Sequence, residues 1–221
     1  MTRIDCTLIS DGSSDVVLIH ILLWLLKSRG VYPGRPIERY DPAVFKRAPK
    51  SLEGRIDHAI ENFPCDLLFI HRDAEGEAIQ IREGQVREAL SRTSGRSKDA
   101  PVVIVIPVRM TESWLLFDED CIRKAAGSPG GKAVLDLPRL KDCERIADPK
   151  ATLHEALRAA SESSGRRLSN FNVGVAIHRV AELVTDYSPL RSLSAFQRLE
   201  ASLGEVLDRN GWGIGSAAEN G

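Results

Sequence analysis

Apolar residues recur along the chain with two different periods, and the alternation between these periods predicts the secondary structure. Three short apolar runs predict strands over residues 4–9, 67–70 and 102–108, and a further short strand is expected over residues 37–40. Apolar residues at helical spacing predict helices over residues 16–26, 52–63 and 78–91. Strands that alternate with helices predict an α/β fold with a parallel sheet at its core and helices on both faces.

The run Leu67-Leu68-Phe69-Ile70 predicts the central strand of this sheet. Its four large apolar residues stand between Pro64 and a polar turn that ends in Gly76, as expected for a strand buried on both faces. Residues 102–108 form a β-branched run without a polar side chain, which is the strongest strand signal in the chain. In open α/β sheets ligands bind outside the carboxyl ends of the strands, so the residues after Ile70 are candidates for chemistry.

The pattern changes after Gly127, where a segment rich in glycine and serine predicts a loop or linker over residues 128–132. We expect an α/β domain over residues 1–126 and a helical C-terminal part over residues 127–209, packed on the core or on a partner. Its helices are expected over residues 151–163, 175–186 and 194–208. Residues 210–221 are rich in glycine and predict a disordered tail.

Residues 16–26 are the most apolar stretch, interrupted only by His20. These 11 residues are fewer than the roughly 20 that span a bilayer. Asp11 and Asp15 stand where a signal peptide would have basic residues, so we expect a cytoplasmic protein without a membrane segment. A helix that is apolar on nearly every side must be covered on nearly every side. It is expected either at the centre of the domain or in an interface with another chain.

Charge and cysteine content exclude several classes of protein. The 30 basic and 31 acidic side chains give a net charge of -1, so the total charge does not indicate non-specific binding to nucleic acid. Binding of that kind would need a local patch or a partner. Four widely spaced cysteines, with no Cys-x-x-Cys pair, predict free thiols in a reducing compartment rather than a zinc site; these are Cys6, Cys65, Cys121 and Cys143.

Acidic residues follow three of the predicted strands. Asp11 follows the first, Asp73 and Glu75 follow the central strand, and Glu112 follows the strand over residues 102–108. If these strands are neighbours in a parallel sheet, the carboxylates converge on one edge, and a divalent cation is the ordinary way to hold several ionised carboxylates together. Ligation by oxygen alone favours Mg²⁺ or Mn²⁺ over zinc. Taken singly, each acid has a structural alternative as a turn residue or an N-terminal helix acid, and Asp15 is assigned to its helix.

Other residues beside these acids have both a functional and a structural interpretation. His71 and Arg72 point to opposite faces of the strand, so at most one of them lies with Asp73; His71 is a candidate proton shuttle, although a packed or capping histidine is the commoner case. Arg109 and Lys150 are candidates to neutralise a phosphate, as is the pair Arg166-Arg167 in a polar loop, but isolated basic residues are usually solvated. Trp114 could stack a base, and its apolar surroundings favour the core instead.

Three segments resemble the motifs of one known family. Residues 8–15 resemble the first motif of Toprim domains, in which a strand ends in an acid followed by glycine and a nearby aspartate. Residues 69–76, with Asp73 and Glu75 one residue apart, resemble the second motif. Residues 107–116, which contain Glu112, are similar to a segment of small Toprim-like proteins encoded beside ABC-type or related ATPases in bacterial anti-phage systems. The resemblance covers residues 4–118.

The resemblance implies a Toprim-like fold, Mg²⁺ binding and cleavage or transfer at phosphodiester bonds, as in topoisomerases, primases and overcoming-lysogenization-defect-type nucleases. The chain departs from the family at Asp11, where a glutamate is usual, and at Glu75, where a second aspartate is usual. In the family that glutamate also transfers protons. The shorter side chain of Asp11 is therefore expected to affect proton transfer more than metal binding.

Three functions are compatible with these features. The leading one is a Mg²⁺- or Mn²⁺-dependent nuclease subunit that acts with an ATPase partner, or as a homo-oligomer, in anti-phage defence, with Asp11, Asp73, Glu75 and Glu112 as metal-binding and catalytic residues. The second is a Toprim-like module with weakened activity that serves as a structural or regulatory partner of an ATPase. The third, a phosphoacceptor receiver domain, would need a lysine after a fifth strand, which the sequence does not supply convincingly.

Overall fold

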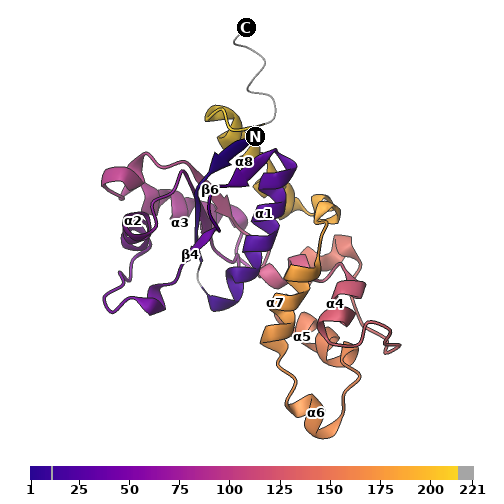
Figure 1. The fold of residues 1–221 in the computed structure, drawn as a ribbon. Coiled ribbons are helices and arrows are strands. Elements are labelled where there is room, and N and C mark those ends of the chain that lie inside the picture. The colour runs from indigo at the N-terminus through magenta and orange to yellow at the C-terminus, as the bar shows by residue number, and fades with distance from the viewer. Residues whose placement is uncertain (11, 214–221) are drawn as a thin grey trace.

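The computed structural model describes residues 1–10 and 12–213 and shows an α/β fold (Figure 1). The strands β4 (Glu38–Tyr40), β2 (Cys6–Ile9), β5 (Leu67–His71) and β6 (Val102–Val105) lie in that order in one sheet, and every neighbouring pair is parallel. The central position predicted for the strand over residues 67–70 is confirmed, because β5 lies between β2 and β6. The carboxyl ends of these strands therefore meet at one edge of the sheet.

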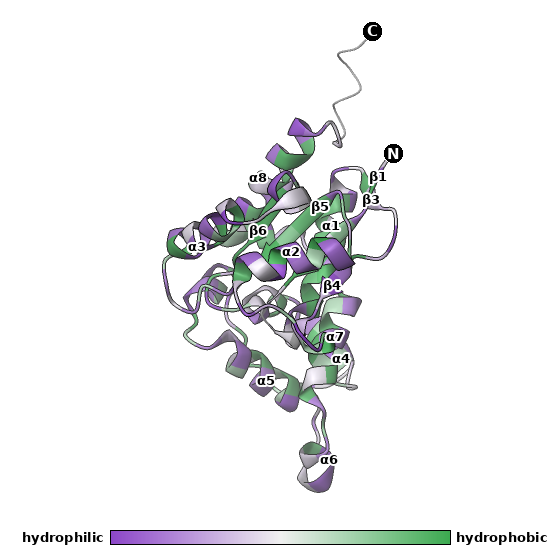
Figure 2. Ribbon diagram, turned by 90° about the vertical axis from the view of Figure 1, so that its left-hand side faces the viewer, coloured by the Kyte–Doolittle hydropathy of each residue, from purple (hydrophilic) through white to green (hydrophobic). Residues whose placement is uncertain are grey.

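Alternation along the strands divides the interior into two apolar clusters. Leu68 and Ile70 of β5 pack beneath α2 (Leu52–Asn62) and α3 (Ile79–Ser91) on one face. Leu67 and Phe69 point to the other face, in a cluster that includes residues of α1 (Leu18–Ser28) and α8 (Ser194–Arg209). Figure 2 shows these strands as a hydrophobic layer with helices on both sides. Apolar side chains on both faces of β5 explain why its sequence shows no alternation with polar residues.

The helix α1 is central to the core. Its side chains at five positions are fully covered, and three further apolar side chains pack against the same cluster. The most apolar stretch was expected either at the centre of the domain or in an interface with another chain. It lies at the centre, since elements of the same chain cover it. Among the described residues, no helix has the length and apolarity needed to cross a membrane. The covered positions are Leu18, Ile21, Leu22, Leu25 and Leu26.

Four helices form a lobe beside the sheet, which we call the helical lobe (residues 119–183): α4 (Glu119–Ala125), α5 (Pro149–Ala160), α6 (Gly165–Ser169) and α7 (Val173–Leu183). In Figure 1 it lies below and beside the sheet, with α6 at its far end. The helix α8 returns to the sheet and packs on β6. The predicted boundary at residue 126 falls after α4, although α4 packs on α7 within the helical lobe.

Several local predictions were wrong. Residues 4–9 form two strands rather than one: β1 (Thr2–Ile4) pairs with β3 (Val31–Pro33) in a separate two-stranded sheet, and β2 begins at Cys6. Asp5 breaks the run, because its backbone N–H bonds the Asp66 carboxylate at 2.8 Å and not a neighbouring strand. The helices α4 and α6 were not predicted, since each is too short to show a helical period. Of the predicted tail, residues 214–221 lie outside the described residues, whereas Trp212 packs against the core.

Short 3₁₀ helices complete the connections: η1 (Ser13–Val17), η2 (Pro42–Val44), η3 (Gly95–Lys98), η4 (Thr111–Leu115), η5 (Leu140–Arg145) and η6 (Ser188–Ser192). Two of them position the candidate site. η1 follows β2 and leads directly into α1, and η4 follows β6. The helical lobe closes on both, because α7 packs on η1 and α5 packs on η4.

Candidate functional site

The carboxyl edge of the sheet carries a buried cluster of one histidine and two aspartates. Asp15 comes from η1, His71 is the last residue of β5, and Asp73 follows two residues later. One possible ligand atom from each of these three side chains lies within 4.8 Å of the other two. No other group of three or more His, Cys, Asp or Glu side chains in the described part of the chain meets this criterion. The parallel topology thus brings the ends of β2 and β5 together, as the sequence predicted. The aspartate after β2 in this cluster is Asp15, whereas the predicted Asp11 lies outside the described residues.

His71 is the centre of the cluster. Its side chain is fully buried, and its Nδ1 lies 3.4 Å from Oδ2 of Asp15. Its Nε2 lies 3.2 Å from Oδ1 of Asp73 and 3.1 Å from Oγ1 of Thr111. Burial lowers the pKa of His71, but the contacts with Asp15 and Asp73 outweigh burial and raise that pKa to about 9. At neutral pH His71 is therefore a cation held between two carboxylates.

Asp15 is held in place from the backbone side. Its Oδ2 accepts a hydrogen bond of 2.7 Å from the backbone N–H of Gly12, which is the N-cap residue of η1. The carboxylate three residues into the turn thus bonds back to the residue that caps η1. Burial raises the pKa of Asp15, yet His71 and the Gly12 N–H together leave this pKa below its usual value. Asp15 is thus an ionised carboxylate at the base of the cluster.

Asp73 is the most exposed member of the cluster. Its side chain is 26% exposed, against 7% for Asp15 and 0% for His71. A molecule that approaches from solvent therefore meets Asp73 first. The turn that holds Asp73 is pinned to the loop after β6, because Ala74 N–H bonds the carbonyl of Pro107 at 3.4 Å and Glu75 N–H bonds the carbonyl of Arg109 at 3.1 Å.

Glu112 lies on the other side of this edge, in η4. Its side chain is 7% exposed, and Nζ of Lys150 from α5 lies 4.0 Å from its Oε1. Burial is the main cause of a raised pKa at Glu112; Lys150 opposes the shift, and the charges of Asp73 and Asp15 add to it. Glu112 therefore feels the charges of Asp73 and Asp15, and its role as a metal ligand stays a prediction.

The predicted residues do not all gather in one place. Asp73 lies in the cluster and Glu112 lies beside it, while Asp11 lies outside the described residues. Glu75 has a side chain that is 65% exposed and ion-paired with Arg82 at 3.0 Å; it is not part of the His71 cluster, and its role as a ligand stays a prediction. Glu75 and Arg109, which share a backbone hydrogen bond, both have left-handed backbone conformations with φ of 51° and 65°. Such conformations are uncommon outside glycine and often mark functional loops.

Two residues of the site were given structural roles from the sequence. Asp15 was assigned to its helix, and packing or capping was the commoner interpretation of His71 beside that of a proton shuttle. Thr111 lies in η4, which has Met110 as its N-cap, and the contact of its hydroxyl with His71 was not predicted. The one available signal was the position of His71 at the end of a buried strand, where alternation separates it from Arg72. Trp114 packs in the core against Phe196, with ring centroids 5.5 Å apart, which confirms the structural interpretation of that residue.

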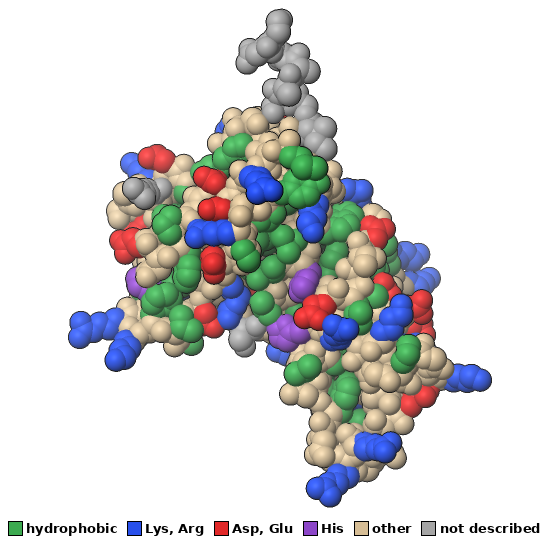
Figure 3. Space-filling model, viewed as in Figure 1, with side chains coloured by type: hydrophobic (Ala, Val, Ile, Leu, Met, Phe, Trp, Pro, Cys, Tyr) green, Lys and Arg blue, Asp and Glu red, His purple; other side chains and the backbone are tan. Residues whose placement is uncertain are grey.

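Basic side chains lie on two exposed segments, one after the edge strand β4 and one at the far end of the helical lobe. Lys46, Arg47 and Lys50 are exposed in the segment that follows β4, the edge strand on one side of the sheet. Arg166 and Arg167 are exposed in α6, at the far end of the helical lobe. Figure 3 shows a hollow between the α/β part and the helical lobe, with Lys and Arg side chains on the projecting ends at either side. A long polyanion could contact both ends at once.

Chemically, the cluster offers two carboxylates and one imidazole. These three side chains suit a divalent cation, and an imidazole shifts the preference from Mg²⁺ towards Mn²⁺ and other transition ions. A cation could replace the proton of His71 as the positive charge between Asp15 and Asp73. Comparison of the chain with protein-family models, with curated proteins and with solved structures found no match in any of the three.

Proposed function

We propose that the chain is a metal-dependent nuclease subunit of Toprim-like type, which hydrolyses phosphodiester bonds of DNA or RNA. The observation that supports this most directly is the buried contact of Asp15, His71 and Asp73 at the carboxyl end of the central strand. Catalytic sites of open α/β sheets lie at this edge. A bound divalent cation would polarise the phosphodiester and activate a water molecule there.

The residues around the cluster have separate roles in this proposal. Asp15, His71 and Asp73 hold the cation, which we expect to be Mn²⁺ or Mg²⁺, and Asp73 faces the substrate because it is the most exposed of the three. Glu112 serves as a further ligand or orients water. Lys150 lies beside Glu112 and contributes a positive charge for the phosphate.

Nucleic acid is the proposed substrate because exposed basic segments lie on either side of the hollow between the α/β part and the helical lobe, while the whole chain carries a net charge of only -1. Local patches rather than total charge would then provide the contacts with phosphate. The proposed ATPase partner and a role in anti-phage defence are supported only by the resemblance of residues 107–116 to Toprim-like proteins, since α1 is covered within the chain.

The test is cleavage of DNA and RNA by the purified chain with Mn²⁺ or Mg²⁺, alongside Asp73→Asn. We expect the substitution to abolish cleavage, and a matched control, Glu77→Gln, to leave it unchanged. Glu77 lies four residues away, and its exposed side chain pairs with Arg82. Cleavage by Asp73→Asn at the rate of the unmodified chain would remove this cluster from the mechanism.

A second candidate function is a structural or regulatory module without catalysis. The fully buried His71 favours it, because a protonated imidazole between two carboxylates compensates one of their two negative charges without a metal ion. Titration calorimetry with Mn²⁺ and Mg²⁺ separates the two functions. Heat of binding that disappears in Asp73→Asn supports the nuclease, whereas no binding at millimolar metal supports the structural module.

A further inference from the structure

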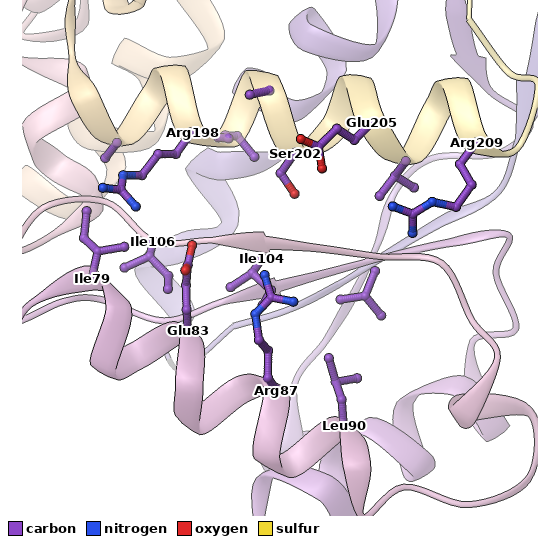
Figure 4. A pocket seen from close by; sticks show the side chains of 15 residues that line it. Ile79, Glu83, Arg87, Leu90, Ile104, Ile106, Arg198, Ser202, Glu205 and Arg209 are labelled. Atoms are coloured by element: carbon purple, nitrogen blue, oxygen red, sulfur yellow. The ribbon is translucent and has the colours of Figure 1, made fainter.

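A groove runs along the free edge of the sheet, away from the candidate metal site. Its floor is β6 with Ile106, and its walls are one face of α3 and one face of α8, which enclose a cavity of about 350 Å³. Figure 4 shows the three elements side by side, with Ile79, Ile106 and Arg198 at one end and Leu90 and Arg209 at the other. Ile104 and Ser202 lie midway along the groove.

The backbone of β6 has an open side. On its inner side the carbonyls of Pro101 and Val105 accept hydrogen bonds from Leu68 and Arg72, so Val103 faces β5 as well. Successive residues of a strand point their N–H and C=O groups to opposite sides, which places those of Val102 and Ile104 on the outer side. In the described part of the chain, no strand pairs there, and these two residues make no backbone hydrogen bond on that side.

The edge also lacks the usual protection against pairing. Edge strands of stable monomers commonly carry a lysine, a proline or a bulge. Residues 102–106 are all aliphatic, and the side chains of Val102 and Ile104 remain half-buried although they are large and apolar. The prolines at 101 and 107 lie outside this stretch. The open edge is therefore long enough and apolar enough to accept another strand.

The charges on the groove walls indicate which strand pairs with the open edge of β6. Along α3 the wall carries Glu83 and then Arg87, and along α8 it carries Arg198 and then Glu205. Among the described residues these four side chains make no ion pair within 4.0 Å. A two-fold axis beside Ile104, perpendicular to the sheet, reverses the order of residues along each wall. Along the groove, Ile104 lies between the two charged residues of each wall. The axis therefore brings the acid of each wall opposite the basic residue of the same wall in the second copy.

We propose that this groove is a homodimer interface, in which β6 pairs antiparallel with β6 of a second copy and joins the two sheets into one. Glu83 then lies opposite Arg87 of the second copy, and Arg198 lies opposite Glu205 of the second copy, each pair occurring twice by symmetry. A two-fold interface must be self-complementary, and the charge order on both walls satisfies this requirement. The interface is independent of the metal site and of the proposed nuclease activity.

Sedimentation of the purified chain over a range of concentrations tests the dimer, with Ile104→Lys as the disrupting variant. A lysine on the free edge blocks strand pairing, so we expect a dimer for the unmodified chain and a monomer for Ile104→Lys. Ile81→Lys is the matched control, because Ile81 lies on α3 outside the groove and is 52% exposed. Circular dichroism verifies that both variants remain folded. A monomeric unmodified chain at every concentration overturns the proposal.

Amide exchange measured by NMR tests the strand pairing and does not depend on a variant. We expect the amides of Val102 and Ile104 to become protected as the concentration of the chain rises. Val103 and Val105 serve as internal controls, because they face β5 and are protected at every concentration. If Val102 and Ile104 exchange rapidly in a dimeric sample, the dimer uses another surface and the proposal is wrong.

A mixing experiment tests the charge order. Glu83→Arg places positive charge at both positions of the α3 wall, and Arg87→Glu places negative charge at both. Each variant alone should dimerise about tenfold more weakly, since two attractive contacts become repulsive. Mixed in equal amounts, they should form a heterodimer in preference to either homodimer. Random mixing would rule out the proposed arrangement of the α3 walls.

Discussion

The carboxyl edge of the sheet and the free side of β6 arrange charge in opposite ways. At the carboxyl edge, the carboxylates of Asp15 and Asp73 both contact the buried His71, so a compensating positive charge comes from within the chain. In the groove beside β6, acids and bases alternate along exposed walls without an ion pair among the described residues. The first arrangement is complete in one chain and the second is completed by a second copy, so the two regions should respond differently to substitution, metal, pH and salt.

The largest effect is expected from Asp15→Ala, which removes one partner of a fully buried imidazole. Such a loss typically costs several kcal/mol, and we expect the free energy of unfolding to fall by about 3 kcal/mol, measured by urea denaturation. Glu88→Ala is the control, because the Glu88–Arg92 pair is 60% exposed on both sides and contributes less than about 0.5 kcal/mol. Equal losses in the two variants would show that His71 needs no partner.

Metal should stabilise the carboxyl edge and leave the groove unchanged. At a Mn²⁺ concentration about 100-fold above its dissociation constant, binding to the folded state adds about 2.7 kcal/mol to the free energy of unfolding. We expect Ile104→Lys to retain this gain and Asp73→Asn to lose it, as measured by denaturation with and without EDTA. A gain that survives in Asp73→Asn would place the bound ion elsewhere in the chain.

The stability of the metal-free chain should fall as the pH rises. The pKa of His71 is about 9 in the folded chain and about 6.5 when unperturbed, so its contribution is complete below about pH 6.5 and is lost as the pH rises through 9. Between about pH 6.5 and pH 8.5 this loss amounts to about 2 kcal/mol. The buried thiols of Cys6 and Cys143 also have raised pKa values, so they add a smaller loss of the same sign as the pH approaches the ordinary thiol pKa of about 8.5.

The reference for this measurement is His71→Gln, which lacks the contribution of His71 and should lose about 2 kcal/mol less than the unmodified chain over the same window. Urea denaturation at several pH values provides both curves in buffer that contains EDTA. A parallel decline in the two curves would mean that another group causes the loss of stability, and His71 would then be neutral in the folded chain.

The sequence predicted the carboxyl edge in part, because its signals are local. Alternating periods predicted the parallel sheet, and the acids after the strands predicted which edge would matter. The contact between Asp15 and His71 was missed, since it joins two residues 56 positions apart and depends on how η1 turns back over β5. Residue types alone favoured a helix-capping acid at Asp15 and a packed histidine at His71, and tertiary packing brought the two together.

The groove could not be predicted from the sequence for a different reason. A strand that is apolar on both faces has the same sequence pattern at the centre of a sheet and at its edge. The side chains show what covers the two faces, but pairing with neighbouring strands uses the backbone, which the residue types do not show. The run over residues 102–108 therefore gave the strongest strand signal, while the structure places β6 at the edge. Its faces are covered by α3 and α8, and only its backbone groups are left without a partner.

The smallest effect is expected from Glu205→Gln, which neutralises one member of two symmetric contacts in the groove. Exposed ion pairs contribute about 0.5 kcal/mol each, so dimerisation should weaken about fivefold, and the difference should disappear at about 1 M salt. Glu200→Gln is the matched control on the same helix, because Glu200 is bound by Arg191 within the chain at 2.7 Å. Sedimentation at low and high salt measures both. An equal effect of the two substitutions would show that α8 acts through overall charge rather than through a contact of Glu205 with Arg198 of the second copy.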